Sequence, residues 1–164
     1  MAASTLPVRN PRTGEWDHEI PITSSEDIAS IATALRAEQA QWVAMGASGR
    51  AACLNRFADA VMAEVGPLGQ ALSIDTGRST FAQFEAIKSV ELIRMWAERA
   101  VPILEELAGA GQSGQVPAVH YQHRLIPYQV VAVISPWNVP LLLAMIDSLA
   151  ALSLIHISEP TRPY

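Results

Sequence analysis

The chain has 164 residues, enough for one domain with a sizeable core and too few for the two-domain architecture of most cofactor-using enzymes. Half of the residues are hydrophobic, 16% are charged and the formal net charge is -5. This composition argues against a disordered chain and gives no support for a nucleic-acid-binding surface. The one cysteine, Cys53, excludes an internal disulfide framework and fits a cytoplasmic protein.

The polar N-terminal residues lack the apolar core of a secretory signal. Residues 10–22 combine Pro, Gly and Asn turn signals with short apolar islands, which predicts an extended arm or hairpin. Ser24 is a favourable N-cap for a helix over residues 25–44, with Glu26 and Asp27 in its positive first turn.

Three more helices are expected in the next part of the chain. The second starts after Ser48 and ends at residues 66–67, a Gly-Pro pair. The third ends at Gly77, because glycine suits a helix C-terminus. The fourth runs over residues 79–102, where its final proline bends or breaks it.

In the last third of the chain the sequence predicts a loop and strands before a final helix. The glycine-rich residues 109–115 are predicted to form a flexible loop, and the alternation over residues 119–125 predicts a half-exposed strand. Residues 130–135 are apolar almost throughout, which is typical of a parallel strand covered on both faces. A helix follows from Pro140. The neighbours of such a strand need crossover connections of about a dozen residues or more, so we expect them in sequence beyond this chain.

Residues 139–157 have the length of a membrane span, but Asp147 lies in the middle and no basic cluster flanks them. We therefore expect a buried helix of a soluble domain and no membrane association.

The histidines His120 and His123 lie on opposite faces of a predicted strand, which argues against a metal site. Cys53 lies within a helix without a neighbouring base, so a small buried residue is favoured over a nucleophile.

The segment ISPWNVP, residues 134–140, follows the predicted buried strand and precedes a helix, which is where open α/β sheets bind their ligands. Its two prolines hold Trp137 and Asn138 in one backbone geometry. The Asn138 amide can donate two hydrogen bonds, as an oxyanion site requires. The alternative is that Asn138 caps the helix and Trp137 fills the core. The residues alone leave both interpretations open.

This segment and several others resemble, in the same order, the N-terminal portion of the NAD(P)-dependent aldehyde dehydrogenase superfamily. The similarity extends from residue 10 to about residue 152. The matching segments are NPRTGE (10–15), a helix ending near Trp42, RAACLNRFADAV (50–61), DTGR (75–78) in place of an E-T-G-K-like tetrapeptide, and VVAVISPWNVPL (130–141).

In such enzymes a cysteine thiolate attacks the aldehyde to form a thiohemiacetal, hydride passes to NAD or NADP, and a glutamate-activated water releases the carboxylic acid. The resemblance implies a catalytic, oxyanion-stabilising role for Asn138. It implies cofactor-binding roles, at the nicotinamide end, for Ile134, Ser135, Pro136 and Trp137. Trp137 also favours the acid-forming branch over the CoA-acylating one, which tends to carry Phe.

The resemblance implies an α/β fold that is a truncated N-terminal part of the aldehyde dehydrogenase fold. It contains a helical segment, oligomerisation-type strands over residues 119–126, and the first strand-turn-helix of a Rossmann-like dinucleotide-binding domain. The parent enzyme is then a homo-dimer or homo-tetramer acting on a small aldehyde, with no metal and no nucleic acid. Its nucleophilic cysteine and general-base glutamate are absent here, so this chain alone is expected to be inactive. The alternative is a complete small helical binding or regulatory protein.

Residues 152–162, LSLIHISEPTR, do not resemble an aldehyde dehydrogenase continuation. They resemble the in-frame translation of a transposase-type sequencing-library adapter. The expected organisation is therefore a partial cofactor-binding domain over residues 1–152 and a non-native tail over residues 153–164.

Overall fold

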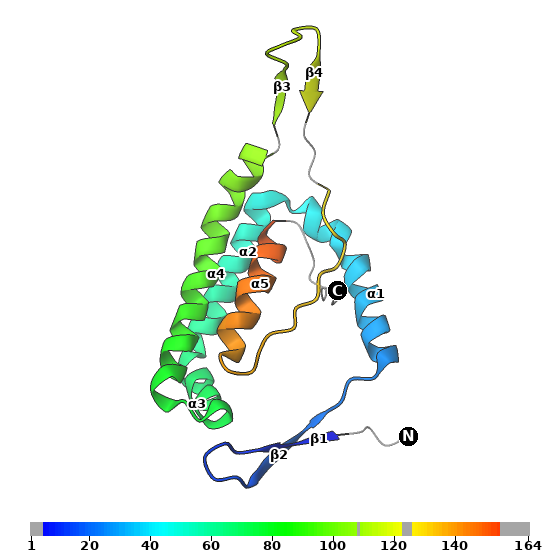
Figure 1. The fold of residues 1–164 in the computed structure, drawn as a ribbon. Coiled ribbons are helices and arrows are strands. Elements are labelled where there is room, and N and C mark those ends of the chain that lie inside the picture. The colour runs from blue at the N-terminus through cyan, green and yellow to red at the C-terminus, as the bar shows by residue number, and fades with distance from the viewer. Residues whose placement is uncertain (1–4, 108, 123–125, 155–164) are drawn as a thin grey trace.

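The computed structural model describes residues 5–107, 109–122 and 126–154, most of which are helical. Three helices pack on the longest one, α4, and α1 extends away from that group (Figure 1). The bounds of the helices are α1 Ser25–Ala44, α2 Gly46–Ala63, α3 Val65–Thr76, α4 Ser79–Leu107 and α5 Pro140–Ser153.

Two antiparallel hairpins lie at opposite ends of the molecule (Figure 1). β1 (Thr5–Arg9) pairs with β2 (Trp16–Pro21), which confirms the hairpin predicted before the first helix. β3 (Ala110–Gln112) pairs with β4 (His120–Gln122). The prediction of a plain loop over residues 109–115 was therefore wrong in its first part, because pairing with β4 supplies the hydrogen bonds that make this glycine-rich segment a strand.

The predicted start of α1 is confirmed in detail. The Ser24 hydroxyl accepts a hydrogen bond from the main-chain N–H of Asp27, and the Asp27 carboxylate accepts one from the N–H of Ser24. The helix nevertheless buries no residue, and Ile28 and Ile31 are more than half exposed. The sequence thus predicts the helix and its cap correctly, although within this chain little covers its apolar face.

Replacing Ser24 by alanine should destabilise α1 by about 1 kcal/mol, because one N-cap hydrogen bond of a capping box is lost. Since α1 contributes no buried residue, the effect should be local: faster amide hydrogen exchange in the first turn of α1 with little change in α2 and α4. Unchanged exchange at Asp27 and Ile28 would contradict this expectation.

The boundary between α2 and α3 differs from the prediction. α2 already ends at Ala63, and the pair Gly66-Pro67 lies in the first turn of α3 instead of ending α2. A proline is compatible with this place because the first-turn N–H groups have no partner within the helix. The predicted end of α3 is confirmed: Gly77 caps it in the left-handed conformation, with φ 68°.

Pro102 was expected to bend or break the fourth helix, but α4 continues through it to Leu107. Pro102 removes the hydrogen bond to the carbonyl of Glu98, four residues earlier. Both residues are exposed, so water can satisfy that carbonyl, while the buried Ala97 and Ala100 keep this part of α4 packed.

The hydrophobic core lies where α2, α4 and α5 meet. Alanines at Ala58 and Ala97 are almost fully buried and let the helices approach closely. The buried members of this cluster are Leu54, Ala58, Val61, Val90, Ile93, Ala97 and Leu149. A smaller cluster joins α3 to α4 through Leu72, Ala82 and Ala86, with Leu141 at the start of α5 packed against it.

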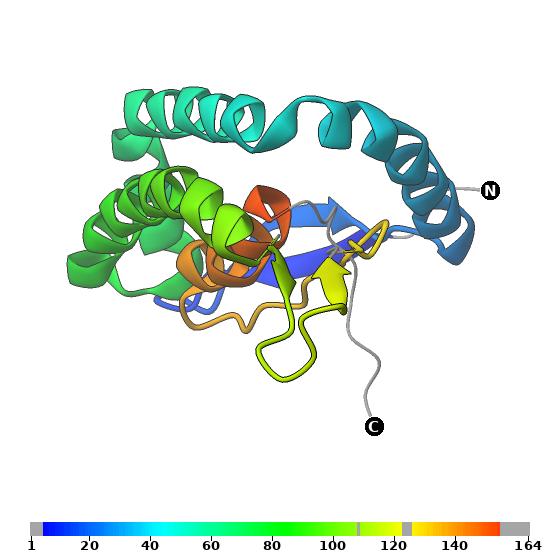
Figure 2. The same ribbon diagram turned by 90° about the horizontal axis from the view of Figure 1, so that it is seen from above.

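Residues 126–139 return from the β3–β4 hairpin to the start of α5, which lies beside α4 (Figure 2). The predicted buried strand over residues 130–135 is not formed: Val131 makes an isolated bridge, and Ile134 is 82% exposed. The segment has the apolar composition of a central strand, but a strand forms only with a paired neighbour, and none extends along it in the described residues. None of the helices in the described ranges combines the length and the hydropathy that a membrane span requires.

Candidate functional site

The five predicted site residues lie together on one mostly exposed stretch before α5. Ile134 and Trp137 are 82% and 81% exposed, Pro136 and Asn138 are exposed, and Ser135 is half-buried. Trp137 and Asn138 form a turn, and Pro140 is the first residue of α5. These residues are consecutive in the chain, and all but Ser135 are exposed, shortly before the N-terminus of α5.

The alternative assignment of this turn is wrong in both parts. Trp137 does not fill the core, since it is among the most exposed large side chains. Asn138 does not cap α5, because the N-cap is Val139 and no side chain in the turn makes a capping hydrogen bond. The oxyanion role of Asn138 itself stays a prediction.

The N-terminus of α5 is capped from another helix. Glu85 of α4 is 2% exposed, and its Oε1 accepts hydrogen bonds from the main-chain N–H groups of Leu141 at 2.8 Å and Leu142 at 3.1 Å. These two amides belong to the helix positions that an N-cap side chain ordinarily serves. A carboxylate here is also favoured by the positive end of the helix dipole.

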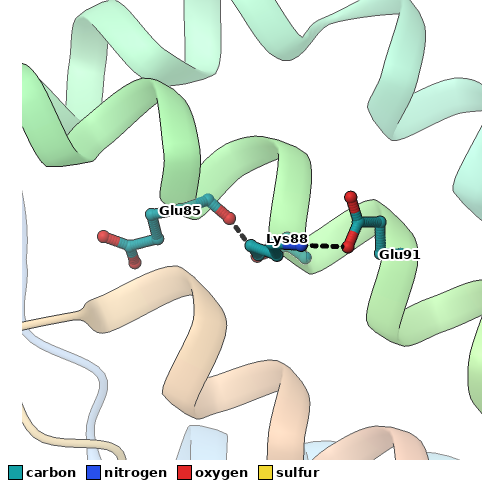
Figure 3. Close-up of polar contacts among 4 residues, drawn as sticks. Glu85, Lys88 and Glu91 are labelled. Carbon is teal, nitrogen blue, oxygen red and sulfur yellow. Dashed lines mark hydrogen bonds and ion pairs between the residues drawn. The ribbon is translucent and has the colours of Figure 1, made fainter.

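The Glu85 carboxylate points away from the neighbouring ion pair on α4 (Figure 3). Lys88 Nζ donates instead to Glu91 at 2.5 Å, one turn further along the helix and near the surface. Burial of a charged group is expensive unless hydrogen bonds compensate for it. The two α5 amides are therefore the interactions that keep the carboxylate acceptable at this buried position.

Arg78, the residue before α4, also binds the turn. Its guanidinium Nη1 donates to the main-chain carbonyl of Asn138 at 2.5 Å. The guanidinium also lies over the ring of Phe81, 4.5 Å from the ring centroid, which restricts its orientation. The left-handed Gly77 reverses the chain between α3 and α4 and places Arg78 beside the turn.

The C-terminal end of α5 is held by α1 and α2. Trp42 Nε1 donates to the carbonyl of Leu152 at 3.0 Å, and Arg50 Nε donates to the carbonyl of Ser153 at 3.4 Å. Arg50 is 2% exposed, and this burial lowers the pKa of its guanidinium. A cation is favourable at this end because the helix dipole is negative there. The boundary predicted at residue 152 lies in this last turn, and residues 155–164 lie outside the described part.

The other candidates do not form a site. His120 is exposed on β4, His123 lies outside the described residues, and within the described ranges no group of three metal-ligating side chains occurs. Cys53 is half-buried, so the prediction of a buried cysteine was only partly right; its Sγ accepts a hydrogen bond from Arg56. A cavity of about 390 Å³ is lined by residues that do not belong to the turn: Gly69, Gln70, Ser73, Ile74, Ser79 and Gln83.

The site is thus an exposed turn before α5, whose N-terminus is capped by the Glu85 side chain of α4. Over residues 1–154 the chain matches the aldehyde dehydrogenase family. The protein belongs to this family. The predicted fold class, an α/β N-terminal part of the aldehyde dehydrogenase fold, is confirmed, with helices predominating and only short strands.

Among relatives of known name, the chain is 34% identical over 153 residues to the Mycolicibacterium smegmatis "Putative succinate-semialdehyde dehydrogenase", whose name specifies NADP(+). The match covers 92% of this chain and 29% of that protein. It is 31% identical over 150 residues to the geranial dehydrogenase of Castellaniella defragrans, covering 89% of this chain and 30% of the relative.

Among solved structures, the chain is similar to the "Putative Aldehyde Dehydrogenase PutA" of Anabaena variabilis, with a TM-score of 0.85 and 34% identity. This likeness covers 93% of the present chain and 32% of the other. The chain therefore spans about 30% of the length of the curated relatives it matches.

Proposed function

We propose that this chain is the N-terminal portion of an enzyme that oxidises a small aldehyde to a carboxylic acid with NAD or NADP. The observation that carries the proposal is the family match over residues 1–154 together with an exposed Asn138 at the end of a fixed turn. Membership of the family supports aldehyde oxidation in general. The relatives named above act on different aldehydes, so no particular substrate follows from them.

In the proposed mechanism the Asn138 side-chain amide donates a hydrogen bond to the oxyanion that forms when a cysteine thiolate attacks the aldehyde. A donor held in place before the reaction stabilises this charge without having to reorganise. Asn138 suits this role because its main-chain carbonyl is hydrogen-bonded to Arg78 and because the residue is exposed to solvent. Loss of hydride from the thiohemiacetal, with bound NAD(P) as the acceptor, would leave a thioester, and hydrolysis of this thioester would release the acid and the free thiol.

Ile134, Ser135, Pro136 and Trp137 are the residues proposed to contact NAD(P). Bound NAD(P) supplies the hydride acceptor. The exposed side chains of Ile134 and Trp137 offer apolar surface of the kind that fits against a nicotinamide ring. These features support the assignment, and the NADP(+) in the name of the M. smegmatis relative agrees with it.

We propose that the 164 residues alone do not oxidise aldehydes. Cys53 lies on α2 with its sulfur beside Arg56, and it does not match the family nucleophile. Without a nucleophile no oxyanion forms for Asn138 to stabilise. We further propose that the protein is cytoplasmic and that the parent enzyme is a homo-dimer or homo-tetramer.

The domain proposal is a partial cofactor-binding domain over residues 1–152 and a non-native tail over residues 153–164. Resequencing the source locus tests it directly. An open frame that continues past residue 152 with a dinucleotide-binding sequence supports the proposal, and genomic DNA that encodes this tail followed by a stop codon contradicts it.

The activity is tested by expressing the uninterrupted frame and following NAD(P)H formation with a panel of aldehydes, beside the 164-residue chain. We expect aldehyde-dependent NAD(P)H from the long protein and none from the short one. The alternative, a complete binding or regulatory protein, is favoured by the closed core of α2, α4 and α5. Cooperative melting of the short chain without NAD(P) binding, together with a locus that ends at residue 164, would favour this alternative.

A further inference from the structure

Two side chains hold the main chain that follows Asn138: Arg78, the residue before α4, and Glu85, in the second turn of α4. Arg78 Nη1 binds the carbonyl of Asn138, and Glu85 Oε1 binds the amides of Leu141 and Leu142. Neither contact involves the Asn138 side chain itself. Together they fix the main chain immediately after Asn138, which determines where its side chain can reach.

Glu85 is at a position where an apolar residue would be expected. It lies on the buried face of α4, near Ala82, Ala86 and Ser89, all of which are almost fully buried. Replacing a buried charge by an apolar side chain is often neutral or stabilising for a fold. What the Glu85 carboxylate adds is therefore orientation, because it aligns the amides of Leu141 and Leu142 at the start of α5.

Arg78 is exposed, so its contact contributes little to the stability of the core. Its guanidinium is oriented by Phe81, whose ring lies 5.1 Å from that of Phe84. The hydrogen bond to the Asn138 carbonyl therefore starts from a side chain whose freedom is already reduced. Such an arrangement positions a peptide group more effectively than it stabilises the fold.

We propose that Arg78 and Glu85 are positioning residues for the side-chain amide of Asn138. The inference rests on the proposed function, because the amide is then the oxyanion donor. Displacement of a catalytic group by about 1 Å can lower a rate by about 10²-fold. Loss of either contact frees the main chain after Asn138 and permits such displacement.

The positioning itself is measured on the 164-residue chain without any reaction. Selective 15N labelling of asparagine gives side-chain amide signals from Asn10, Asn55 and Asn138, of which the first two lie outside the turn. Arg78→Ala and Glu85→Ala should shift or broaden the Asn138 signals and leave the other two unchanged. Glu85→Ala should also raise hydrogen exchange at Leu141 and Leu142 by about tenfold or more, as loss of a charge-assisted hydrogen bond predicts.

Conservative variants and matched controls separate positioning from general destabilisation. Glu85→Gln keeps an oxygen acceptor, and Arg78→Lys keeps a cationic donor, so both should largely restore the Asn138 signals. Ser89→Ala removes a buried hydroxyl on α4 that donates to the Glu85 carbonyl, and Arg94→Ala removes an arginine that pairs with Asp59. Both controls should leave the Asn138 signals unchanged. Should Glu85→Ala fail to fold, Arg78→Ala compared with Arg78→Lys still decides the question, because Arg78 is exposed.

Unchanged Asn138 signals in folded Arg78→Ala and Glu85→Ala chains would overturn the proposal. In the uninterrupted enzyme, Arg78→Ala should lower kcat by up to about 10²-fold with KM little changed, and Arg78→Lys should recover most of it. Altered Asn138 signals with an unchanged kcat would support the positioning and contradict instead the oxyanion role of Asn138. The two proposals can thus fail separately.

Discussion

Replacing Leu149 by alanine is expected to lower the free energy of unfolding of the helical core by about 2 to 5 kcal/mol. Leu149 is fully buried where α5 meets α2 and α4, and it is the only α5 member of that buried cluster. The truncated side chain would leave a cavity that the closely packed alanines around it cannot fill. The loss is large against the marginal stability of a domain of this size.

Chemical denaturation followed by circular dichroism measures this loss. Ile146→Ala is the matched control, because Ile146 lies on the same helix but is 42% exposed, so it should cost clearly less. Equal losses for the two variants would show that α5 is not packed on the core in the way described. A loss confined to Leu149→Ala agrees with the packing.

Replacing Asn138 by alanine in the uninterrupted enzyme is expected to lower kcat by about 10²- to 10³-fold, the effect of removing one side-chain donor from an oxyanion site. Because Asn138 is exposed and makes no cap to α5, the same change should barely alter the melting temperature. The combination of a large kinetic effect with a small stability effect is what marks a residue acting on the transition state.

Asn138→Asp sharpens this measurement. Aspartate has nearly the same shape as asparagine but offers no N–H donor and adds a negative charge beside the developing oxyanion, so activity should fall at least as far as in Asn138→Ala. Asn55→Ala, an exposed asparagine on α2, should leave kcat unchanged. Full activity of the Asn138 variants would contradict the assigned role.

Local signals in the sequence predicted local structure well. Ser24 with Asp27 specifies a helix start because the interacting groups are three residues apart. Gly77 specifies a helix end because a left-handed residue is needed there. The hairpin before α1 likewise follows from turn residues between short apolar islands. In each case the interacting partners lie close together in the chain.

The errors arose where distant contacts decide the structure. Pro102 does not end α4, because packing at Ala97 and Ala100 keeps the helix intact. Ala110–Gln112 is a strand because a partner eight or more residues later pairs with it. The segment at 130–135 has the right composition for a strand, but a strand also requires a neighbour. Composition and spacing carry no information about such partners.

For the candidate site, too, the sequence predicted the residues that are close together in the chain and missed the distant ones. The motif and resemblance pointed to residues 134–138, and in the structure all of these except Ser135 are exposed shortly before α5. The supporting residues Arg78 and Glu85 were missed, since each acts on main-chain atoms more than fifty positions away. One signal was available: Glu85 is spaced three residues after Ala82 and four before Ser89, so a charge falls on a face that is otherwise small and buried.

The order of events during synthesis follows from how α5 is held. Its N-terminal end is hydrogen-bonded to Glu85, which lies 56 residues before Leu141. Its C-terminal end is hydrogen-bonded to Trp42, which lies 110 residues before Leu152. As the chain leaves the ribosome, α2, α3 and α4 can associate through nearer contacts before α5 has been made. Until it arrives, the space for Leu149 between α2 and α4 stays open, and a nascent chain paused there should present an apolar groove to chaperones. The turn that carries Asn138 can thus take its final form only after α5 has been made.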